Sequence, residues 1–291
     1  MEDYIIRATD AKKQIRAFGA VTTHLVDEAS KIHGTSPVVS AALGRLLTAA
    51  TMMGQMLKGE KDLLTLQIKG NGPLRGLVVT ADRNGNVKGY PYNSVVDLPL
   101  NSIGKLDVST AIGQGSLTVI KDLGLREPYV GQISLVSGEI AEDLTYYFAS
   151  SEQIPSAVAL GVLVDRDFSI KQAGGFIVQL LPEAEEETVQ NLENRLKSIS
   201  SVTQLLEEGK GPEDILKLIL GDIIIMDKIP TQFHCNCSRE RVEKALVSIG
   251  VKDLQEILDQ DHRTELKCHF CNRTYVFEES DLKKIIEDLS R

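Results

Sequence analysis

Cys235-Asn236-Cys237 and Cys268-His269-Phe270-Cys271 together hold all four cysteines of this 291-residue chain. The 234 residues before them contain no cysteine, and 30 residues separate the two pairs. A compact turn over that distance brings four sulfur atoms to one point, which is the arrangement that a tetrahedral zinc ion requires. The spacing therefore predicts a small zinc-binding domain, to which we assign residues 231–291.

Three kinds of site fit two close cysteine pairs: a permanent zinc site, two stable disulfides, or a switch between a metal-bound and an oxidised form. The compartment decides among them, because stable disulfides persist in oxidising environments. Residues 1–7 (MEDYIIR) lack the basic start and apolar run of a secretory signal. We therefore expect a cytoplasmic protein, and stable disulfides are the least favoured of the three.

Length and composition place the whole chain among soluble globular proteins of about two domains, with 42% apolar residues. Residues 37–57 are apolar, but they include Arg45 and several polar side chains, so we expect a buried core helix and no membrane span. The net charge of −9 argues against general affinity for nucleic acid, which depends on clustered lysine and arginine.

Residues 1–182 are predicted to form an α+β domain of mainly antiparallel sheets with packed helices. Residues 4–21 resemble a hairpin, and residues 25–32 and 37–57 have helical patterns, the second with Ser36 as N-cap and Pro37 at its first position. Apolar alternation and turn residues then predict a series of strands, at residues 64–68, 77–79, 116–120, 132–136, 157–164 and 176–180, with a further helix at 140–150.

Residues 183–230 are predicted to form a helical, charged linker. Apolar residues recur there at spacings of three and four, and residues 183–214 carry nine acidic and three basic side chains, a net charge of −6. Further short helices are expected at residues 202–207 and 213–220. The linker is either a solvated set of helices packed on the core or a segment that packs reversibly and comes loose at low cost in free energy.

The C-terminal domain is predicted to hold a helix at residues 239–249, with Ser238 as its N-cap and Gly250 at its end. A capping box of Asp253 and Glu256 predicts a second helix, and a third follows near the C-terminus. The second cysteine pair lies between two predicted strands, as in zinc ribbons. A domain of about 60 residues has a marginal core, and structural zinc supplies roughly 10–16 kcal/mol, so loss of the metal should unfold it.

The cysteine pairs also fit a redox switch. Sulfurs around zinc lie roughly 3.8 Å apart, against about 2.05 Å in a disulfide, so each pair can oxidise locally and thereby eject the metal. Arg239, Lys267 and Arg273 are candidates for stabilising thiolates, or ordinary surface cations. His234 and His269 are alternative ligands, although four cysteines already fill a tetrahedron.

Catalytic motifs are not evident elsewhere. Residues 70–76 have the wrong glycine spacing for a dinucleotide loop, and His24 and His33 are linked to no nucleophile or acid pair. We therefore predict that the protein is not an enzyme. A methionine cluster on the apolar helix is interpreted as core packing, with an adaptable binding surface as the alternative; it consists of Met52, Met53 and Met56.

Several stretches of the chain resemble the signature motifs of one known family. Residues 234–241 (HCNCSRER) and 268–272 (CHFCN) are similar to its zinc-binding motifs. Residues 146–148 (YYF), 151–156 (SEQIPS) and 173–176 (AGGF) are similar to its core signatures. The chain thus resembles the redox-switched heat-shock protein thirty-three chaperones, and the resemblance spans essentially the whole chain.

The resemblance implies an ATP-independent holdase that binds unfolding client proteins and acts as a homodimer. It implies one zinc ion in the reduced, inactive state, bound by Cys235, Cys237, Cys268 and Cys271. It further implies that oxidants, with heat or another unfolding stress, form the disulfides Cys235–Cys237 and Cys268–Cys271, release zinc and unfold the C-terminal domain and linker. Two alternatives remain: a zinc-ribbon module that binds nucleic acid or a transcription partner through a purely structural zinc, and a disulfide-exchange oxidoreductase.

Overall fold

The computed structural model describes residues 2–199 and 201–290. The chain divides into two compact units, Met1–His234 and Cys235–Arg291, and each is described by itself. The predicted α+β class is confirmed, because both large sheets are built mainly from antiparallel pairs and helices pack against them.

Sheet A of the first unit has five antiparallel strands in the order β10-β1-β2-β9-β8. They are β1 (Tyr4–Asp10), β2 (Ile15–Val21), β8 (Ser156–Val164), β9 (Ile170–Leu180) and β10 (Ile223–Pro230). Sheet B has six strands in the order β11-β5-β4-β3-β6-β7, antiparallel except for the short β11–β5 pair. They are β3 (Leu63–Gly70), β4 (Gly76–Ala81), β5 (Asn86–Pro91), β6 (Gly115–Asp122), β7 (Tyr129–Ser134) and β11 (Gln232–Phe233).

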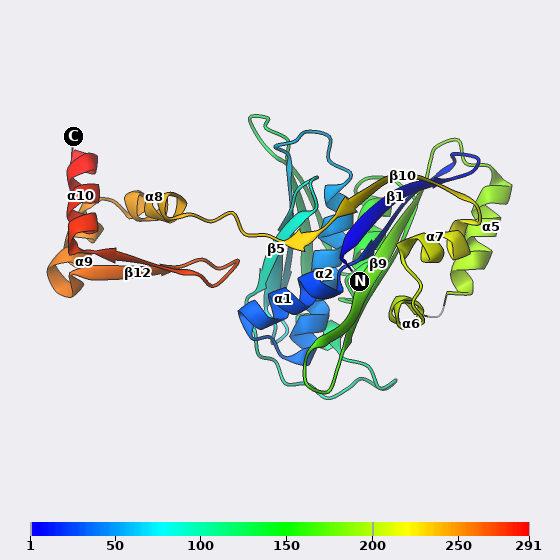
Figure 1. Ribbon diagram of the computed structural model, residues 1–291, viewed down its shortest axis with the longest axis horizontal. Coiled ribbons are helices and arrows are strands. Elements are labelled where there is room, and N and C mark those ends of the chain that lie inside the picture. The colour runs from blue at the N-terminus through cyan, green and yellow to red at the C-terminus, as the bar shows by residue number, and fades with distance from the viewer. Residues whose placement is uncertain (1, 200, 291) are drawn as a thin grey trace. The chain divides into compact units, whose positions relative to one another are not determined.

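Helix α2 (Pro37–Gly54) lies between the two sheets and forms the centre of the core (Figure 1). It is long and apolar enough to cross a membrane by length and composition, but 89% of that window is buried inside the unit, as predicted for a core helix. Small residues let its neighbours approach: a Cβ on Gly44 would lie 2.5 Å from Val26 of α1 (Thr23–His33) and 2.9 Å from Val162 of β8. Met52 and Met53 are buried in this core, as predicted, whereas Met56 is half-buried and lies in the turn after the helix.

The start of α2 is confirmed at Ser36 and Pro37, but the serine hydroxyl makes no capping bond to its own helix. It instead accepts the amide of Val96 and donates to the carbonyl of the same residue. This side chain therefore fastens the start of the core helix to the loop that follows β5. Two further helices belong to this unit, α3 (Val108–Ile112) and α4 (Ala141–Ser150).

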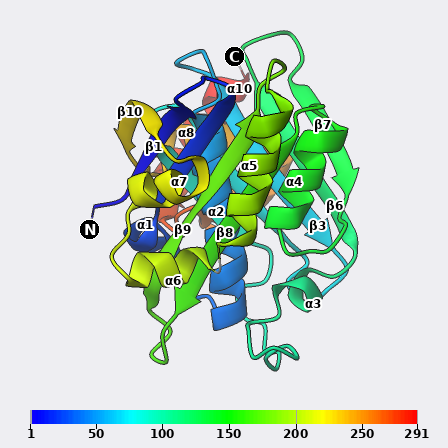
Figure 2. The ribbon, with the colours of Figure 1, turned by 90° about the vertical axis from the view of Figure 1, so that its right-hand side faces the viewer.

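Three helices cover the outer face of sheet A (Figure 2). They are α5 (Glu186–Lys197), α6 (Val202–Glu207) and α7 (Pro212–Leu220). They contribute buried apolar side chains to a common cluster with β1, β2 and β9, namely Leu192, Val202, Leu205, Leu206, Ile215, Leu216 and Ile219. Their charged residues face outward, which explains how so acidic a segment packs on a sheet.

The segment predicted as a helical linker, residues 183–230, ends in a strand. Residues 223–230 form β10, which pairs with β1 at the edge of sheet A, and β11 then joins sheet B beside β5. The helical segment is therefore held at both ends by strands of the first unit. Strand β5 and helix α3 also lie outside the elements predicted from the sequence.

The second unit consists of three helices and one hairpin. They are α8 (Arg239–Ile249), α9 (Val251–Asp261), β12 (Arg263–Lys267), β13 (Thr274–Glu278) and α10 (Glu279–Ser290). Ser238 caps α8 by accepting the amide of Arg241, and Gly250 ends the helix, both as predicted. The predicted capping box at Asp253 is wrong: α9 begins at Val251, because Gly250, with φ of 90°, both closes α8 and opens α9.

The core of the second unit is small. Among its described residues, the buried apolar cluster consists of Leu246, Leu254, Leu258, Phe277, Leu282 and Ile285. A cluster of this size supports only a few kcal/mol of stability in a unit of this length. The small core is consistent with the expectation that residues 235–290 need an additional cross-link to stay folded.

Candidate metal centre

The hairpin tip of the second unit carries Cys268 and Cys271. The amide of Cys268 donates to the carbonyl of Arg273 over 2.9 Å, and the amide of Asn272 donates to the carbonyl of Cys268 over 2.8 Å. Asn272 has a left-handed backbone with φ of 56°, a conformation that asparagine tolerates better than most residues. These bonds fold the chain into a tight loop that presents both thiols on one side, as predicted from the strands around the pair.

The other two thiols come from the segment before α8. Cys235 and Cys237 lie in a stretch without regular secondary structure, just ahead of the capping residue of that helix. The four Sγ atoms lie within 4.8 Å of one another, with Cys235 and Cys268 at 3.7 Å and Cys237 and Cys271 at 3.4 Å. Both distances are close to the roughly 3.8 Å between sulfurs that share a tetrahedral zinc ion.

The four sulfurs are therefore positioned to bind one metal ion. Four thiolates are soft ligands that favour zinc, and four of them fill its tetrahedral shell. Within the described part of the chain, His234 and His269 do not belong to this cluster. All four cysteines are half-buried.

Cys235 and Cys237 differ in pKa because their surroundings differ. Burial raises the pKa of Cys235 to about 12. Burial also opposes ionisation of Cys237, but hydrogen bonds from Tyr275 and the neighbouring thiols outweigh it and lower the pKa of Cys237 to about 7. The surroundings of Cys237 therefore favour its thiolate, which is the form that binds metal and reacts with oxidants.

Tyr275 contacts the cysteine cluster, which the sequence did not predict. Its hydroxyl lies 3.1 Å from the sulfur of Cys237. Arg273 lies near the same groups, and a hydrogen bond to Tyr275, together with the charges of Tyr275 and Cys237, raises the pKa of its guanidinium. Of the three cations proposed as thiolate partners, Arg273 is the one whose electrostatic interaction with the site is evident.

Arg239 has a structural role instead. Its guanidinium donates to the carbonyl of Val276 and to Asp281, each over 2.6 Å, and lies 4.3 Å from the ring centroid of Phe277. These contacts tie the start of α8 to β13 and α10. The first cysteine pair is thereby held against the hairpin that carries the second.

Comparison with known proteins identifies the family. A family model described as "Hsp33 protein" matches residues 3–278. The chain belongs to the Hsp33 family. Its Hsp33 relatives include the 33 kDa chaperonin of Lachnoclostridium phytofermentans, 60% identical over 98% of this chain and 99% of the relative. The 33 kDa chaperonin of Acetivibrio thermocellus is 52% identical over 99% of this chain and 98% of that protein.

A solved Hsp33 structure has the same fold. The crystal structure of the 33 kDa chaperonin of Thermotoga maritima matches with a TM-score of 0.93 and 40% identity, over 99% of each chain. The family resemblance found in the cysteine motifs and the core signatures is thus confirmed over nearly the whole chain.

Tyr275→Phe is expected to weaken zinc binding by about tenfold, the lower end of the range for losing a hydrogen bond to a metal ligand. The ring remains, so the hairpin should keep its packing. Competition with a chromophoric chelator under reducing conditions measures the affinity, and Tyr146→Phe, an exposed tyrosine of the first unit, is the control. Unchanged affinity would show that the hydroxyl does not support the Cys237 thiolate.

Proposed function

We propose that this Hsp33-family protein is a redox-regulated, ATP-independent holdase of the cytoplasm that protects unfolding proteins from aggregation. Cys235, Cys237, Cys268 and Cys271 would hold one Zn²⁺ ion in the reduced, inactive state. Zinc, when bound, supplies the cross-link that the small core of residues 235–290 lacks. Oxidation to the pairs Cys235–Cys237 and Cys268–Cys271 would release it, and the active assembly would be a homodimer.

Three successive segments of the chain would have different functions. Residues 1–182 would bind clients and dimerise, residues 183–230 would act as the releasable linker, and residues 231–291 would be the switch. Supporting the proposal, β11 ends at Phe233, two residues before the first cysteine, and the amide of His234 still donates to the carbonyl of Val87. The cysteine-bearing part of the switch, from residue 235 on, thus follows directly on a strand that is only two residues long.

The observation that carries the proposal is how the linker helices are docked. They bury a continuous apolar face on sheet A, which release would expose, and polar contacts hold the ends of that face. The hydroxyl of Tyr4 donates to Glu213 over 2.6 Å, and Lys228 pairs with the same carboxylate at 3.0 Å. Exposed apolar surface of this kind is what binds unfolding proteins.

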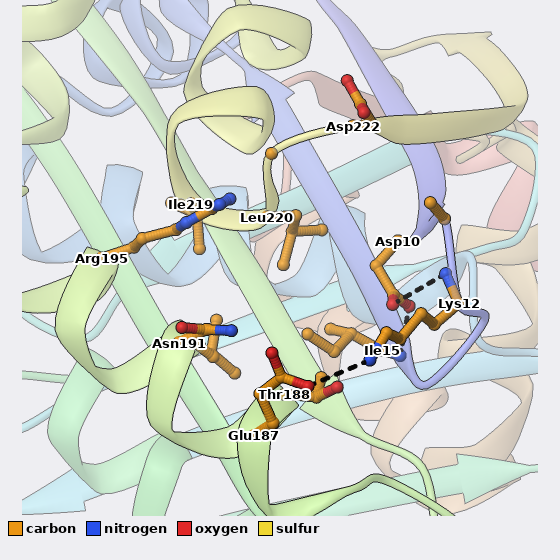
Figure 3. Close-up of a pocket in the computed structure, with 13 residues that line it drawn as sticks. Asp10, Lys12, Ile15, Glu187, Thr188, Asn191, Arg195, Ile219, Leu220 and Asp222 are labelled. Carbon is orange, nitrogen blue, oxygen red and sulfur yellow. Dashed lines mark hydrogen bonds and ion pairs between the residues drawn. The ribbon is translucent and has the colours of Figure 1, made fainter.

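A polar cleft of about 260 Å³ marks the other end of the docked linker (Figure 3). It separates the β1–β2 turn from α5 and the end of α7. Lys12 in the turn pairs with Glu185 at 2.9 Å and with Glu187 at 3.5 Å. Ion pairs as exposed as these are screened by solvent and contribute little to stability, so the linker is fastened here by weak contacts that a loss of neighbouring structure can break.

An aggregation assay tests the proposal. Light scattering of heat-unfolding citrate synthase is followed with reduced and with peroxide-treated protein, while a chromophoric chelator records zinc release. Suppression of scattering by the oxidised form alone, together with release of one zinc ion per chain, is the expected result. If zinc leaves and both forms stay inert, the holdase proposal fails. Binding to DNA at physiological salt would support the zinc-ribbon alternative, and turnover of a dithiol substrate the oxidoreductase.

Mass spectrometry of unreduced peptides tests the disulfide pairing. Bonds within each pair would leave the segment before α8 free of the hairpin, so the switch could unfold. Bonds between Cys235 and Cys268 and between Cys237 and Cys271 would instead tie the two segments together. Recovery of the second pattern would contradict the proposed mechanism of release.

A further inference from the structure

Strand β8 forms an open edge of sheet A. Among residues 2–199 and 201–290, the one strand that pairs with β8 is β9. Natural sheets protect such edges with charged residues or proline. The opposite edge strand, β10, contains Asp227, Lys228 and Pro230, whereas β8 reads Ser-Ala-Val-Ala-Leu-Gly-Val-Leu-Val and has neither. An unprotected apolar edge is suited to pairing with another strand.

The backbone of β8 presents hydrogen-bonding groups along this edge. Ala173 of β9 is opposite Val162, and both its amide and its carbonyl bond toward the β2 side, to Thr23 and Thr22. Val162 therefore points its own amide and carbonyl away from β9. The amide of Val158 also points away from β9, because it donates to the hydroxyl of Thr145 in α4.

The orientation of backbone groups alternates along a strand, so Leu160, between these two residues, also faces outward. Leu160 and Val162 thus present two donors and two acceptors at the spacing of an antiparallel ladder. In the described parts of the chain, no strand pairs with these groups.

A groove of about 530 Å³ runs beside this stretch of the edge. Val162 and α2 lie on one side of it, where the lining is apolar and includes Pro37, Ala41 and Leu106. The start of α6 forms the other side with small hydroxyl side chains. Two large apolar residues of the lining are strongly exposed: the relative solvent-accessible surface is 59% for Leu100 and 61% for Phe168. A strand added to β8 would direct alternate side chains to the two sides.

The charged side chains that line the groove indicate which kind of segment would bind in it. Arg45 lines the groove but is neutralised by Glu139 at 2.7 Å. The remaining charged groups in the lining are Lys105, Asp165 and Arg166, so positive charge is in excess although the chain as a whole is acidic. A segment with lysine or arginine would be disfavoured there, and one flanked by a carboxylate would be favoured.

The accessible edge is also short. Thr145 covers it at Val158, and a register shift between Leu163 and Val164 ends the regular ladder. A stable dimer needs roughly 800 Å² from each partner, which two free ladder residues in a recessed groove do not offer to a folded second copy. A single extended chain, by contrast, fits a groove of this size.

We propose that the β8 edge binds a short, extended, apolar segment of an unfolding polypeptide by strand addition. This inference rests on the proposed holdase function and assigns it a binding site. Linker release would enlarge the site, because α6 covers the other face of β8: a Cβ on Gly161 would lie 2.7 Å from Thr203. Oxidised protein should therefore bind such segments more tightly than reduced protein.

The test uses a fluorescent seven-residue peptide of alternating valine and serine with acidic ends, and a matched peptide that is N-methylated at alternate amides. Fluorescence anisotropy with oxidised wild-type protein is expected to show at least about tenfold weaker binding of the methylated peptide, because its ladder donors are lost. Equal binding of the two peptides would overturn strand addition, whatever the protein variants do.

Two variants test the protein side. Leu160→Pro removes the outward amide but no bond to β9, and proline is tolerated at such edge positions. It is expected to weaken binding of the unmethylated peptide about tenfold, whereas Leu160→Ala, which keeps the amide, should weaken it by less than about threefold. Cooperative thermal unfolding confirms that each variant folds. Equal affinities of the two variants would contradict the role of the edge.

The same variants separate this inference from the holdase proposal. If oxidised wild-type protein suppresses aggregation of citrate synthase and Leu160→Pro does so equally well, strand addition to β8 is wrong and the holdase stands. If wild-type protein suppresses no aggregation but binds the peptide in an amide-dependent way, the edge site stands and the holdase fails.

Discussion

Cys268→Ser is expected to abolish tight zinc binding and to unfold residues 235–290 under reducing conditions, while the first unit keeps its fold. The variant removes one of four sulfurs that lie within 4.8 Å of one another. The buried apolar cluster of the second unit is too small to replace a metal that contributes roughly 10–16 kcal/mol. Zinc content and the amide NMR spectrum of the second unit measure the effect.

His269→Ala is the matched control for this experiment. It alters the same hairpin tip but leaves the four-sulfur cluster complete. It should keep one zinc ion per chain and a dispersed spectrum. A folded, zinc-free second unit in the serine variant would show that the metal is not what holds this unit together, and the proposed trigger would have no physical basis.

The sequence predicted those parts of the fold that local pattern determines. The hairpin at residues 4–21, the core helix and its start, and the cap of α8 follow from apolar spacing and capping residues close in the chain. Strand β10 did not follow, although it begins with three isoleucines. Its partner is β1, near the other end of the chain, and such a pairing leaves no local signal. The position of α9 was missed because Gly250 serves two helices at once.

The candidate metal site, like the fold, was predicted from the sequence only in part. Spacing alone brought the four cysteines together as candidates, because a hairpin tip and a tight pair before a helix each present two thiols. The role of Tyr275 depends on how the hairpin packs against Cys237, which no spacing encodes. Arg239 stands beside the first pair in the sequence, yet its side chain bonds to Val276 and Asp281. Proximity along the chain therefore identified the candidate ligands but not the side chains that contact them.

Leu216→Asp is expected to make the reduced, zinc-loaded protein suppress aggregation without oxidant. Leu216 of α7 is fully buried against sheet A, close to Gly19 of β2. A carboxylate at this position costs several kcal/mol while α7 is docked, and undocking of the helix relieves that cost. Leu218→Asp is the matched control, because Leu218 lies on the same helix and is 45% exposed.

Two measurements on these variants separate linker release from its consequence. Trypsin cleavage after Arg195 and Lys197 of α5 and after Lys210 reports whether the linker is docked, and light scattering of citrate synthase reports client binding. Leu216→Asp should be cleaved faster and active, and Leu218→Asp should match the wild type in both assays. A Leu216→Asp variant that is cleaved rapidly but stays inert would mean that exposing this face of sheet A is insufficient. Activation would then require the unfolded second unit itself, and the linker would serve only as its tether.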